Sequence, residues 1–435
     1  MRKKIVLIGA GSAVFTKGLV LDVLERSAMK WHIALVDTSG KVLDIISAVV
    51  KKMIAQKGAD VELSVSTDRR DVLAGADYVV STIGVGGRRS WEQDVFIPRE
   101  FGIFQPVGDT VGPGGISRAL RMIPQLLDIA RDVEALCPGA VFFNYSNPMT
   151  MNCMGIRRGS KVPVIGLCHG VKNGLRRVAA FMGTPQEDLS YTACGLNHMV
   201  FMYHLRRRGK DMFPAFIEKL DAIAPEGRAI GPLTADFVRE HHTYVVSDDR
   251  HFSEFVPETL ARGAYFGKTL GMDGAFHFEE TIREGDEEFA LYTGYAASGN
   301  PLPDDFFVRE PGEHELLMDM IESLEEDRPG VYYVNVPNNG AVAGLPADVV
   351  VERPALFSGS GVAPLQMTDF PVELLPYMAR YTAVYEIAVQ AALSGDARLV
   401  RYAIEACCLP LGRERLGQMT DRLLAAHKDY LPQFR

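Results

Sequence analysis

The sequence has no long hydrophobic run and few cysteines. No apolar stretch among its 435 residues approaches the roughly 20 residues that a membrane-spanning helix needs. Its six cysteines lack the spacing of a disulfide scaffold. The N-terminus begins with basic residues, but the apolar run that follows reaches only about five residues before the first glycine, which indicates a strand rather than a signal peptide. We therefore expect a cytoplasmic protein with reduced thiols and no membrane partner.

The sequence also has no excess of basic residues, no internal repeat and no low-complexity tract. Its formal net charge is −9, which argues against a nucleic-acid partner or an anionic membrane surface. Apolar residues make up 47% of the chain and charged residues 23%, so a large core can form. A chain of this length is expected to divide into two or more lobes.

Short apolar runs alternate with helical patterns in the first half of the chain. The expected strands are residues 3–8, 32–37, 77–83, 140–147 and 162–167, and the expected helices are residues 16–27, 42–56 and 116–138. This alternation predicts an α/β fold with a Rossmann-like, doubly wound parallel sheet. The later sequence favours antiparallel strands followed by helices. We predict an NAD-binding lobe at 1–195 and an α+β substrate lobe at 196–435, similar to lactate and malate dehydrogenases, with the active site between them.

The first expected strand ends in the glycine-rich sequence GAGSA, which opens a helix. Gly9 suits a tight turn and Gly11 a close approach of the backbone to a pyrophosphate, which would lie with Ser12 at the helix N-terminus. Asp37 ends the second strand and is suited to bind a ribose diol, which favours NAD over NADP. Val14 stands where the fingerprint has Gly or Ala, so a purely structural glycine turn is the alternative.

Two further turns are expected at the same edge of the sheet. The GVGG sequence that begins at Gly84 follows the strand at 77–83, and NYSNP, which begins at Asn144, ends the strand at 140–147. Ligands bind open α/β sheets at the carboxyl ends of the strands, so we predict that Gly84 and Asn144 contact the cofactor. An Asn-Pro turn that faces a nicotinamide is similar to that of malate and lactate dehydrogenases.

Seven stretches occur in the order found in the NAD- and manganese-dependent glycosidases of glycoside hydrolase family 4, which the chain resembles over nearly its whole length. They are GAGS (9–12), GDTVGPGGISRALR (108–121), NYSNPMT (144–150), GLCHG (166–170), GLNHM (195–199), DRHFSEFVP (249–257) and NVPNNG (335–340). The resemblance implies hydride transfer from C3 of the sugar to NAD, loss of the acidified C2 proton, elimination of the aglycone, water addition and return of the hydride. A divalent cation would stabilise the enolate.

The resemblance assigns the metal to Cys168 and His198, which match the family's ligands. One thiolate, one imidazole and substrate oxygens suit a borderline ion, and the resemblance implies manganese. A lone cysteine at a strand end is more often simply buried, so the paired Asn-His motif carries this assignment. Asn147 matches an asparagine that lies between the metal and the sugar hydroxyls, with a turn residue as the alternative reading.

The resemblance also supplies candidate proton carriers. His169 stands where phospho-sugar members have an acidic donor, so it either protonates the leaving oxygen or binds substrate. Asp109 matches an acid that raises the basicity of the C2 base, or it is a turn residue. Some members use a tyrosine as that base, and the matching stretch here has none, which leaves His251 or Asp249 for the role. Tyr244 is a less favoured candidate.

The substrate is expected to be an unphosphorylated glycoside. Cys-His-Gly at 168–170 resembles members that cleave such substrates, particularly α-uronides (galacturonides or glucuronides), with α-galactosides second. A uronate carboxylate suits a bidentate guanidinium, and Arg88, Arg89 or Arg250 could supply it, although exposed arginines are common. The resemblance further implies a homodimer or homotetramer.

Two other classes of protein remain possible from the sequence. A 2-hydroxy acid dehydrogenase shares the expected nucleotide-binding lobe and the Asn-Pro turn, but it needs a histidine held by an aspartate and no thiolate. A non-catalytic NAD sensor needs no metal ligands. Metal-dependent turnover of an aryl glycoside would separate the first alternative from a glycosidase, and absence of any turnover would favour the second.

Overall fold

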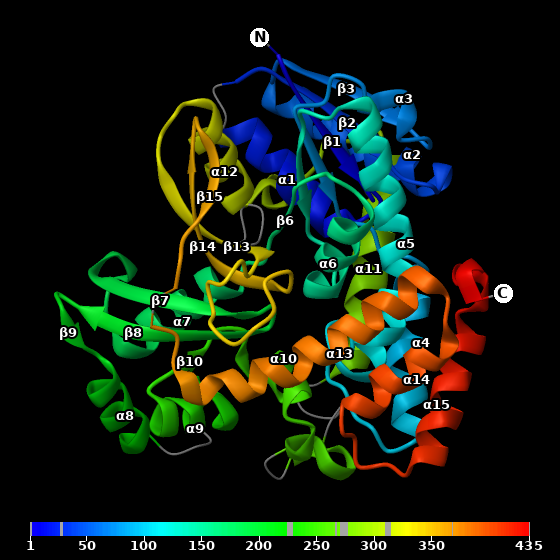
Figure 1. Cartoon of the computed structure of the whole chain (residues 1–435). Helices are drawn as coiled ribbons and strands as arrows, with labels where there is room; N and C mark the ends of the chain where they lie inside the picture. The colour runs from blue at the N-terminus through cyan, green and yellow to red at the C-terminus, as the bar shows by residue number, and fades with distance from the viewer. Residues whose placement is uncertain are drawn as a thin grey trace.

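The computed structural model of the chain describes residues 2–26, 29–223, 229–265, 268–269, 277–308, 315–367 and 369–434. Ser27, the last residue of one expected helix, lies outside the described residues. Figure 1 shows a central sheet that extends from β3 to β9 and β10, with helices packed against its faces. No helix in the described ranges combines the length and the apolar character that would let it cross a membrane.

Six strands form the parallel half of a mixed, thirteen-stranded sheet, in the order β6-β5-β4-β1-β2-β3. They are β1 (Lys3–Ile8), β2 (Trp31–Val36), β3 (Val61–Ser66), β4 (Tyr78–Ser81), β5 (Val141–Asn144) and β6 (Val164–Gly166). This is the strand order of a dinucleotide-binding sheet, in which the direction of winding reverses between β1 and β4. The α/β prediction is confirmed, and all five expected strands are present.

The apolar strands of this half are covered on both faces. Ile5 and Leu7 of β1 pack in one hydrophobic cluster, whereas Val6 and Ile8 pack in another on the opposite side of the sheet. This follows from the alternation of side chains along a strand, and it explains why the strands are continuously apolar. The helices of this part are α1 (Ala13–Arg26), α2 (Gly40–Lys57), α3 (Arg70–Leu73), α4 (Gly87–Glu100), α5 (Gly112–Leu136), α6 (Met149–Gly159) and α7 (Gly170–Met182).

The second half of the sheet is antiparallel and continues directly from β6. Its strands are β7 (Leu189–Leu196), β8 (Met199–Arg207), β9 (Lys210–Asp211), β10 (Tyr244–Val245), β13 (Gly330–Pro337), β14 (Val350–Ser358) and β15 (Gly361–Pro364). β13 pairs with β6 through Asn335 and Gly166, and β14, β7, β8 and β10 follow in space. Residue 195, where we predict the boundary between lobes, lies within β7. A separate ribbon joins β11 (Ala264–Tyr265) to β12 (Lys268–Thr269).

The remaining helices are α8 (Phe213–Ala222), α9 (Pro232–His241), α10 (Asp248–Phe252), α11 (Phe278–Ala297), α12 (Glu315–Glu325), α13 (Leu375–Ser394), α14 (Ala397–Ala406) and α15 (Arg413–Ala426). Of these, α11 packs on α1 and α2 of the parallel half, and the others lie mainly beside the antiparallel strands and in the lower part of the molecule in Figure 1. Short 3-10 segments include η3 (Ser253–Phe255), which follows α10 directly. The expected helical C-terminal region is thus α13 to α15.

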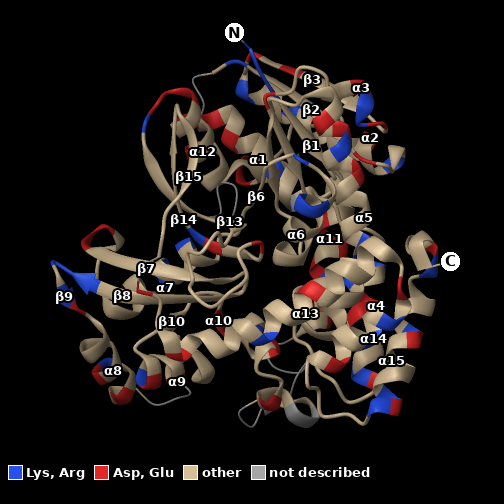
Figure 2. Ribbon diagram, viewed as in Figure 1, with Lys and Arg blue, Asp and Glu red and all other residues tan. Residues whose placement is uncertain are grey.

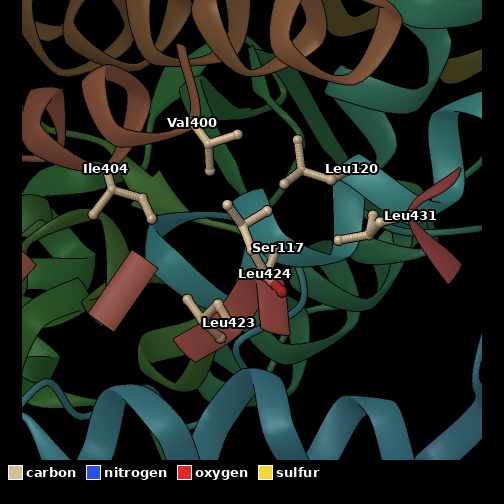
Figure 3. A pocket seen from close by; sticks show the side chains of 7 residues that line it. All are labelled: Ser117, Leu120, Val400, Ile404, Leu423, Leu424 and Leu431. Atoms are coloured by element: carbon tan, nitrogen blue, oxygen red, sulfur yellow. The ribbon is translucent and has the colours of Figure 1, made fainter. Parts of the chain in front are cut away.

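The C-terminal helices are held to α5 by apolar packing and to each other by charge. Side chains of α5, α14 and α15 together with Leu431 line a narrow apolar pocket, shown in Figure 3. On the outer surface Arg401 pairs with Asp421 at 2.6 Å and Arg413 with Glu405 at 3.0 Å. Figure 2 accordingly shows basic and acidic residues interspersed along α14 and α15. This region supports α5, whose N-terminal end borders the candidate site.

Candidate active site

The glycine turn after β1 has the geometry of a dinucleotide-binding turn. Gly9 has φ +90°, and a Cβ built on it would lie 2.7 Å from the backbone nitrogen of Ile83, so glycine is required there. The Gly11 amide donates to Oδ2 of Asp37 at 2.9 Å, and Ser12 donates its amide to the Gly9 carbonyl. These contacts place the predicted cofactor residues together at the N-terminal end of α1, at the reversal point of the sheet.

The other two predicted cofactor contacts differ from each other. Gly84 follows β4 at the same edge and accepts an amide hydrogen bond from Gly87. Asn144 ends β5 but is fully buried, and its amide group donates to the Ser146 carbonyl at 2.9 Å and accepts from the Ser146 amide at 3.2 Å. Its side chain therefore stabilises the turn that leads into Asn147, and a contact with the cofactor stays a prediction.

Asp109, His198 and His251 form a group of three potential metal ligands, which we call the cation group. One donor atom of each lies within 4.8 Å of the other two. The two imidazole rings lie 4.1 Å apart between centroids. Asp109 also accepts a hydrogen bond from Nδ2 of Asn147 at 2.9 Å. The structure thus brings three predicted site residues and Asn147 together, although they come from four separate stretches of sequence.

His198 is held in an unusual backbone conformation that aims its ring. Asn197 and His198 form the two-residue turn between β7 and β8, and His198 has φ +65°, which is uncommon for a residue with a side chain. Its carbonyl accepts from the Ser247 hydroxyl at 2.6 Å. Its Nδ1 lies 2.8 Å from Oγ1 of Thr110, whose hydroxyl donates to Asp109 at 2.6 Å. Thr110 therefore accepts from Nδ1–H of His198, which fixes the tautomer and orientation of the ring.

The charges in the cation group favour ligand forms. Burial acts to raise the pKa of Asp109, but the positive charges of His198, His251 and Arg118 outweigh it and hold that pKa below its usual range. Burial lowers the pKa of His251 to about 4, while Asp109 acts in the opposite direction. Near neutral pH this gives a carboxylate beside a neutral imidazole, and both are metal-binding forms.

Cys168 and His169 follow β6 at the neighbouring position on the sheet edge. The Cys168 sulfur is half-buried and accepts from the Gly170 amide at 3.4 Å. A Cβ on Gly170 would lie 3.4 Å from this sulfur and 3.6 Å from Val246, whose neighbour Ser247 binds His198. Cys168 and His198 therefore both lie near the segment that contains Val246 and Ser247. Within the described part of the chain the cation group does not include it, and its role as a metal ligand stays a prediction.

His169 lies between the cation group and a buried acid. Its charge acts on His251 and on Glu352, a fully buried residue of β14. Burial raises the pKa of Glu352 to about 7, against the effect of amide donors from Asn197 and Asn335. Two of the motifs noted in the sequence, GLNHM and NVPNNG, therefore supply the donors of this buried acid. The proton-carrying role of His169 stays a prediction.

Of the two candidates for the C2 base, only His251 lies in the cation group. Asp249 accepts hydrogen bonds from the amides of Leu233 and Thr234 at 2.8 and 2.9 Å and from the Tyr265 hydroxyl. It therefore holds the N-terminal end of α9, and its role as a base stays a prediction. Tyr244 is buried in β10, where its hydroxyl accepts from Arg177.

The predicted carboxylate-binding arginines lie beside α11. Arg88 pairs with Asp286 through Nε at 2.6 Å, and Arg89 pairs with the same carboxylate. Arg250 donates from Nη2 to the Thr281 hydroxyl at 2.7 Å. These contacts direct the guanidinium groups of Arg88 and Arg250 toward α11, and their role in binding a substrate carboxylate stays a prediction.

Family models match most of the chain. The model of family 4 glycosyl hydrolases matches residues 4–183, and the model of their C-terminal domain matches residues 193–406. The chain belongs to glycosyl hydrolase family 4. This glycosidase is 31% identical to an α-galactosidase of Rhizobium meliloti, over 99% of its own length and 89% of that protein. It is 28% identical to an α-galacturonidase of Thermoanaerobacterium saccharolyticum, over 90% and 88% of the two chains.

Solved structures show the same fold. A 6-phospho-α-glucosidase from gut microorganisms, in complex with NAD and Mn²⁺, superposes with a TM-score of 0.87 at 18% identity and full coverage of both chains. A malate dehydrogenase of Cryptosporidium parvum gives a TM-score of 0.55 at 14% identity, over 91% of this chain and 100% of that one. The dehydrogenase alternative therefore shares the fold alone, whereas the glycosidase resemblance is confirmed.

Three residues of the site were not foreseen. Thr110 links Asp109 to His198, Glu254 binds the loop before Asp109, and Arg118 lies next to Asn147. The carboxylate of Glu254, in η3, accepts from the amides of Val107 and Gly108 at 2.6 and 2.8 Å. Thr110 and Arg118 lie within the quoted GDTVGPGGISRALR stretch and Glu254 within DRHFSEFVP. Their positions carried a signal, but their contacts could not be read from it.

Proposed function

We propose that this family 4 enzyme cleaves an unphosphorylated α-uronide, a galacturonide or a glucuronide, with NAD and a divalent transition metal, manganese by preference. The observation that carries the proposal is the cation group beside the dinucleotide turn in a chain similar to α-galacturonidases. Gly9 packs on Ile83, the Ile83 carbonyl accepts from Ser146, and Asn147 binds Asp109, so contacts connect the two sites.

The residues present fit NAD. Gly11 has no space for a side chain, because a Cβ on it would lie only 2.5 Å from Asp37, and this close packing brings the turn and Asp37 together. Ser12 would meet the pyrophosphate at the start of α1, and Asp37 would bind the ribose diol through Oδ1, which also accepts from the Ser39 amide at 2.9 Å. Asp37 would repel a 2′-phosphate, which favours NAD over NADP.

The residues present also fit a divalent cation. A carboxylate and two imidazoles in mutual reach are a donor set for a first-row transition metal, and the Thr110 hydroxyl fixes the His198 ring. Bound NAD would supply a reversible hydride acceptor for C3 of the sugar, and the bound cation would stabilise negative charge on the oxygens of C2 and C3. Asn147 would hold those hydroxyls beside Asp109.

The chain's own residues carry the protons. His169 donates a proton to the leaving oxygen, so the aglycone departs as a neutral alcohol. Two ligand sets are compared. If Cys168 and not His251 binds the cation, His251 is free of the metal and accepts the C2 proton. Mn²⁺ titration of Cys168→Ser and His251→Asn separates the two sets of ligands, because only the variant that lacks a ligand loses affinity.

The proposal is tested with a panel of nitrophenyl glycosides. The α-galacturonide, α-glucuronide, α-galactoside and α-glucoside are assayed with and without NAD⁺, Mn²⁺ and a thiol reductant. We expect α-uronides to be cleaved fastest, only in the complete mixture, without net formation of NADH and with deuterium uptake at C2 in D₂O. Retention of the original C2 hydrogen would contradict the elimination route, and net oxidation of a 2-hydroxy acid would identify a dehydrogenase.

A second candidate function is that of an α-galactosidase. It is favoured by the similarity to the α-galactosidases of Rhizobium meliloti, at 31% identity, and Bacillus subtilis, at 28% identity over the whole of both chains. The same panel decides between the two, since a galactosidase would prefer the neutral sugar. Assembly as a homodimer or homotetramer and location in the cytoplasm stay predictions, and light scattering would test the first.

A further inference from the structure

Arg118 is an arginine that lies next to the candidate active site. It lies on α5, and its Nε donates to the backbone carbonyl of Asn147 at 3.1 Å. A Cβ built on Gly84 would lie 3.9 Å from Nη2 of Arg118, and the guanidinium lies 5.8 Å from the centre of the Trp91 ring. Asn147 in turn binds Asp109. Arg118 therefore lies between the turns that end β4 and β5, next to the cation group.

The terminal nitrogens of Arg118 remain available to a ligand. Among the residues that the structure describes, neither Nη1 nor Nη2 has an acceptor within hydrogen-bonding distance. Burial lowers the pKa of Arg118 and Asp109 acts against this effect, but a guanidinium stays charged in a protein. The Asp109 carboxylate acts on Arg118 electrostatically, but no carboxylate of the described residues is hydrogen-bonded to its terminal nitrogens, so these two donors suit an anionic ligand.

Arg118 lies next to the residues that would hold the sugar. A pyranose that presents its C2 and C3 hydroxyls to the cation group has C5 opposite C2, and C5 carries the carboxylate of a uronide. Arg118 borders the cation group through Asn147, whereas Arg88 and Arg250 are directed toward α11. The pyrophosphate of a dinucleotide is expected at the Gly9 turn instead.

We propose that Arg118 binds the carboxylate of a uronide substrate and thereby selects uronides over neutral glycosides. The inference rests on the proposed function, because it names the residue that gives that site its substrate preference. Arginine suits this role because its planar fork binds both oxygens of a carboxylate at once. The two donors replace the water that the carboxylate loses on binding.

The first test compares Arg118→Gln with Arg131→Gln in the enzyme loaded with NAD⁺ and Mn²⁺. Arg131 is a matched control on the same helix, because its side chain is 59% exposed and pairs only with Asp128 in the described structure. For Arg118→Gln we expect kcat/KM for the aryl α-galacturonide to fall by about 100-fold, the loss of a charged hydrogen-bonded pair, and that for the α-galactoside to change far less. Arg131→Gln should preserve both values.

Arg118→Lys should recover part of the preference, since an ammonium group keeps the charge but cannot bind both oxygens as a fork. An equal loss for charged and neutral substrates in Arg118→Gln would overturn the inference, as would a loss of NAD⁺ affinity in place of uronide selectivity. Arg250→Gln provides a further comparison. If this variant loses the preference for uronides and Arg118→Gln keeps it, the inference is overturned and Arg250 is the residue that binds the carboxylate.

A second measurement does not depend on turnover. Calorimetry with free galacturonate and galactose should show tighter binding of galacturonate to the loaded enzyme, and Arg118→Gln should remove the difference. A carboxylate preference that depends on Arg118 in a protein without glycosidase activity would overturn the proposed function and keep this inference. Cleavage of α-uronides with a carboxylate preference that Arg118→Gln leaves unchanged would overturn this inference and keep the proposed function.

Discussion

Asp94 and Asp109 are two buried carboxylates on neighbouring segments, and their partners differ in kind. Asp94 of α4 is bound by both terminal nitrogens of Arg121, and His427 lies 3.0 Å from its Oδ1. Asp109 meets a hydroxyl and an amide, with two imidazoles in reach. A guanidinium fork binds the first carboxylate directly, whereas the second takes its hydrogen bonds from neutral donors and has positive charge only in its surroundings. Both side chains are buried, but Asp94 holds Arg121 in place, whereas Asp109 belongs to a group of potential metal ligands.

Replacing Asp94 by Asn should give the largest loss of stability. The change leaves Arg121 buried with an uncompensated charge, so we expect the free energy of unfolding to fall by about 3–5 kcal/mol. Urea denaturation of the metal-free protein measures this. Asp109→Asn is the comparison variant and should lose less stability, because no guanidinium donates to its carboxylate and no buried cation is left without its bound partner. Equal losses in the two variants would remove the distinction between the carboxylates.

Asp109→Asn should instead reduce metal affinity. The amide that replaces the carboxylate carries no charge, so Mn²⁺ should bind about 100-fold more weakly, by analogy with the loss of one charged partner. Titration of the variant with Mn²⁺ in the presence of NAD⁺ checks this. The folded fraction of Asp94→Asn serves as the control, and its Mn²⁺ affinity should match that of the wild-type protein. Unchanged affinity in Asp109→Asn would exclude Asp109 as a ligand.

Glu254 is a third buried carboxyl group, and its pKa predicts a pH-dependent stability. Burial raises the pKa of Glu254 from its usual 4.5 to about 8, against the effect of the amides of Val107 and Gly108. The folded state then keeps this proton while the unfolded chain loses it, so its contribution to stability is full below pH 4.5 and is lost as the pH rises through about 8.

Glu254→Gln should remove that dependence, since its amide oxygen can still accept both backbone hydrogen bonds. We therefore expect the difference in free energy of unfolding between variant and wild type to increase in favour of the variant between pH 5 and pH 8, roughly the interval between the two pKa values. Denaturation midpoints at several pH values measure it. A constant difference across that interval would show that the carboxyl titrates normally in the folded protein.

The parallel half of the fold could be predicted from sequence because its signals are local. Apolar runs such as Lys3–Ile8 end at glycine or asparagine turns, and the strand order follows from the alternation with helices. The strand at 61–66 was missed, because its residues alternate in exposure and lie at the edge of the sheet. Its neighbours β1 and β2 are buried throughout most of their length.

The candidate site was only partly predictable, because its contacts join distant residues. Asp249 and His251 are nearly adjacent in sequence, yet a single helical turn sends one to the end of α9 and the other to Asp109. Arg118 was overlooked in favour of arginines outside the long helix. Its signal was an arginine in an otherwise largely apolar helix, where Arg121 proved to be a structural partner of Asp94.

The joint between β6 and β13 ties the two family regions into one hydrogen-bonded ladder. Severing the chain near residue 195 would leave both pieces with a bare strand edge, and such edges invite pairing with other chains. The halves are thus poor candidates for separate expression. A chimaera that swaps substrate specificity between relatives has to transfer β13 and β14 together with the loops they carry.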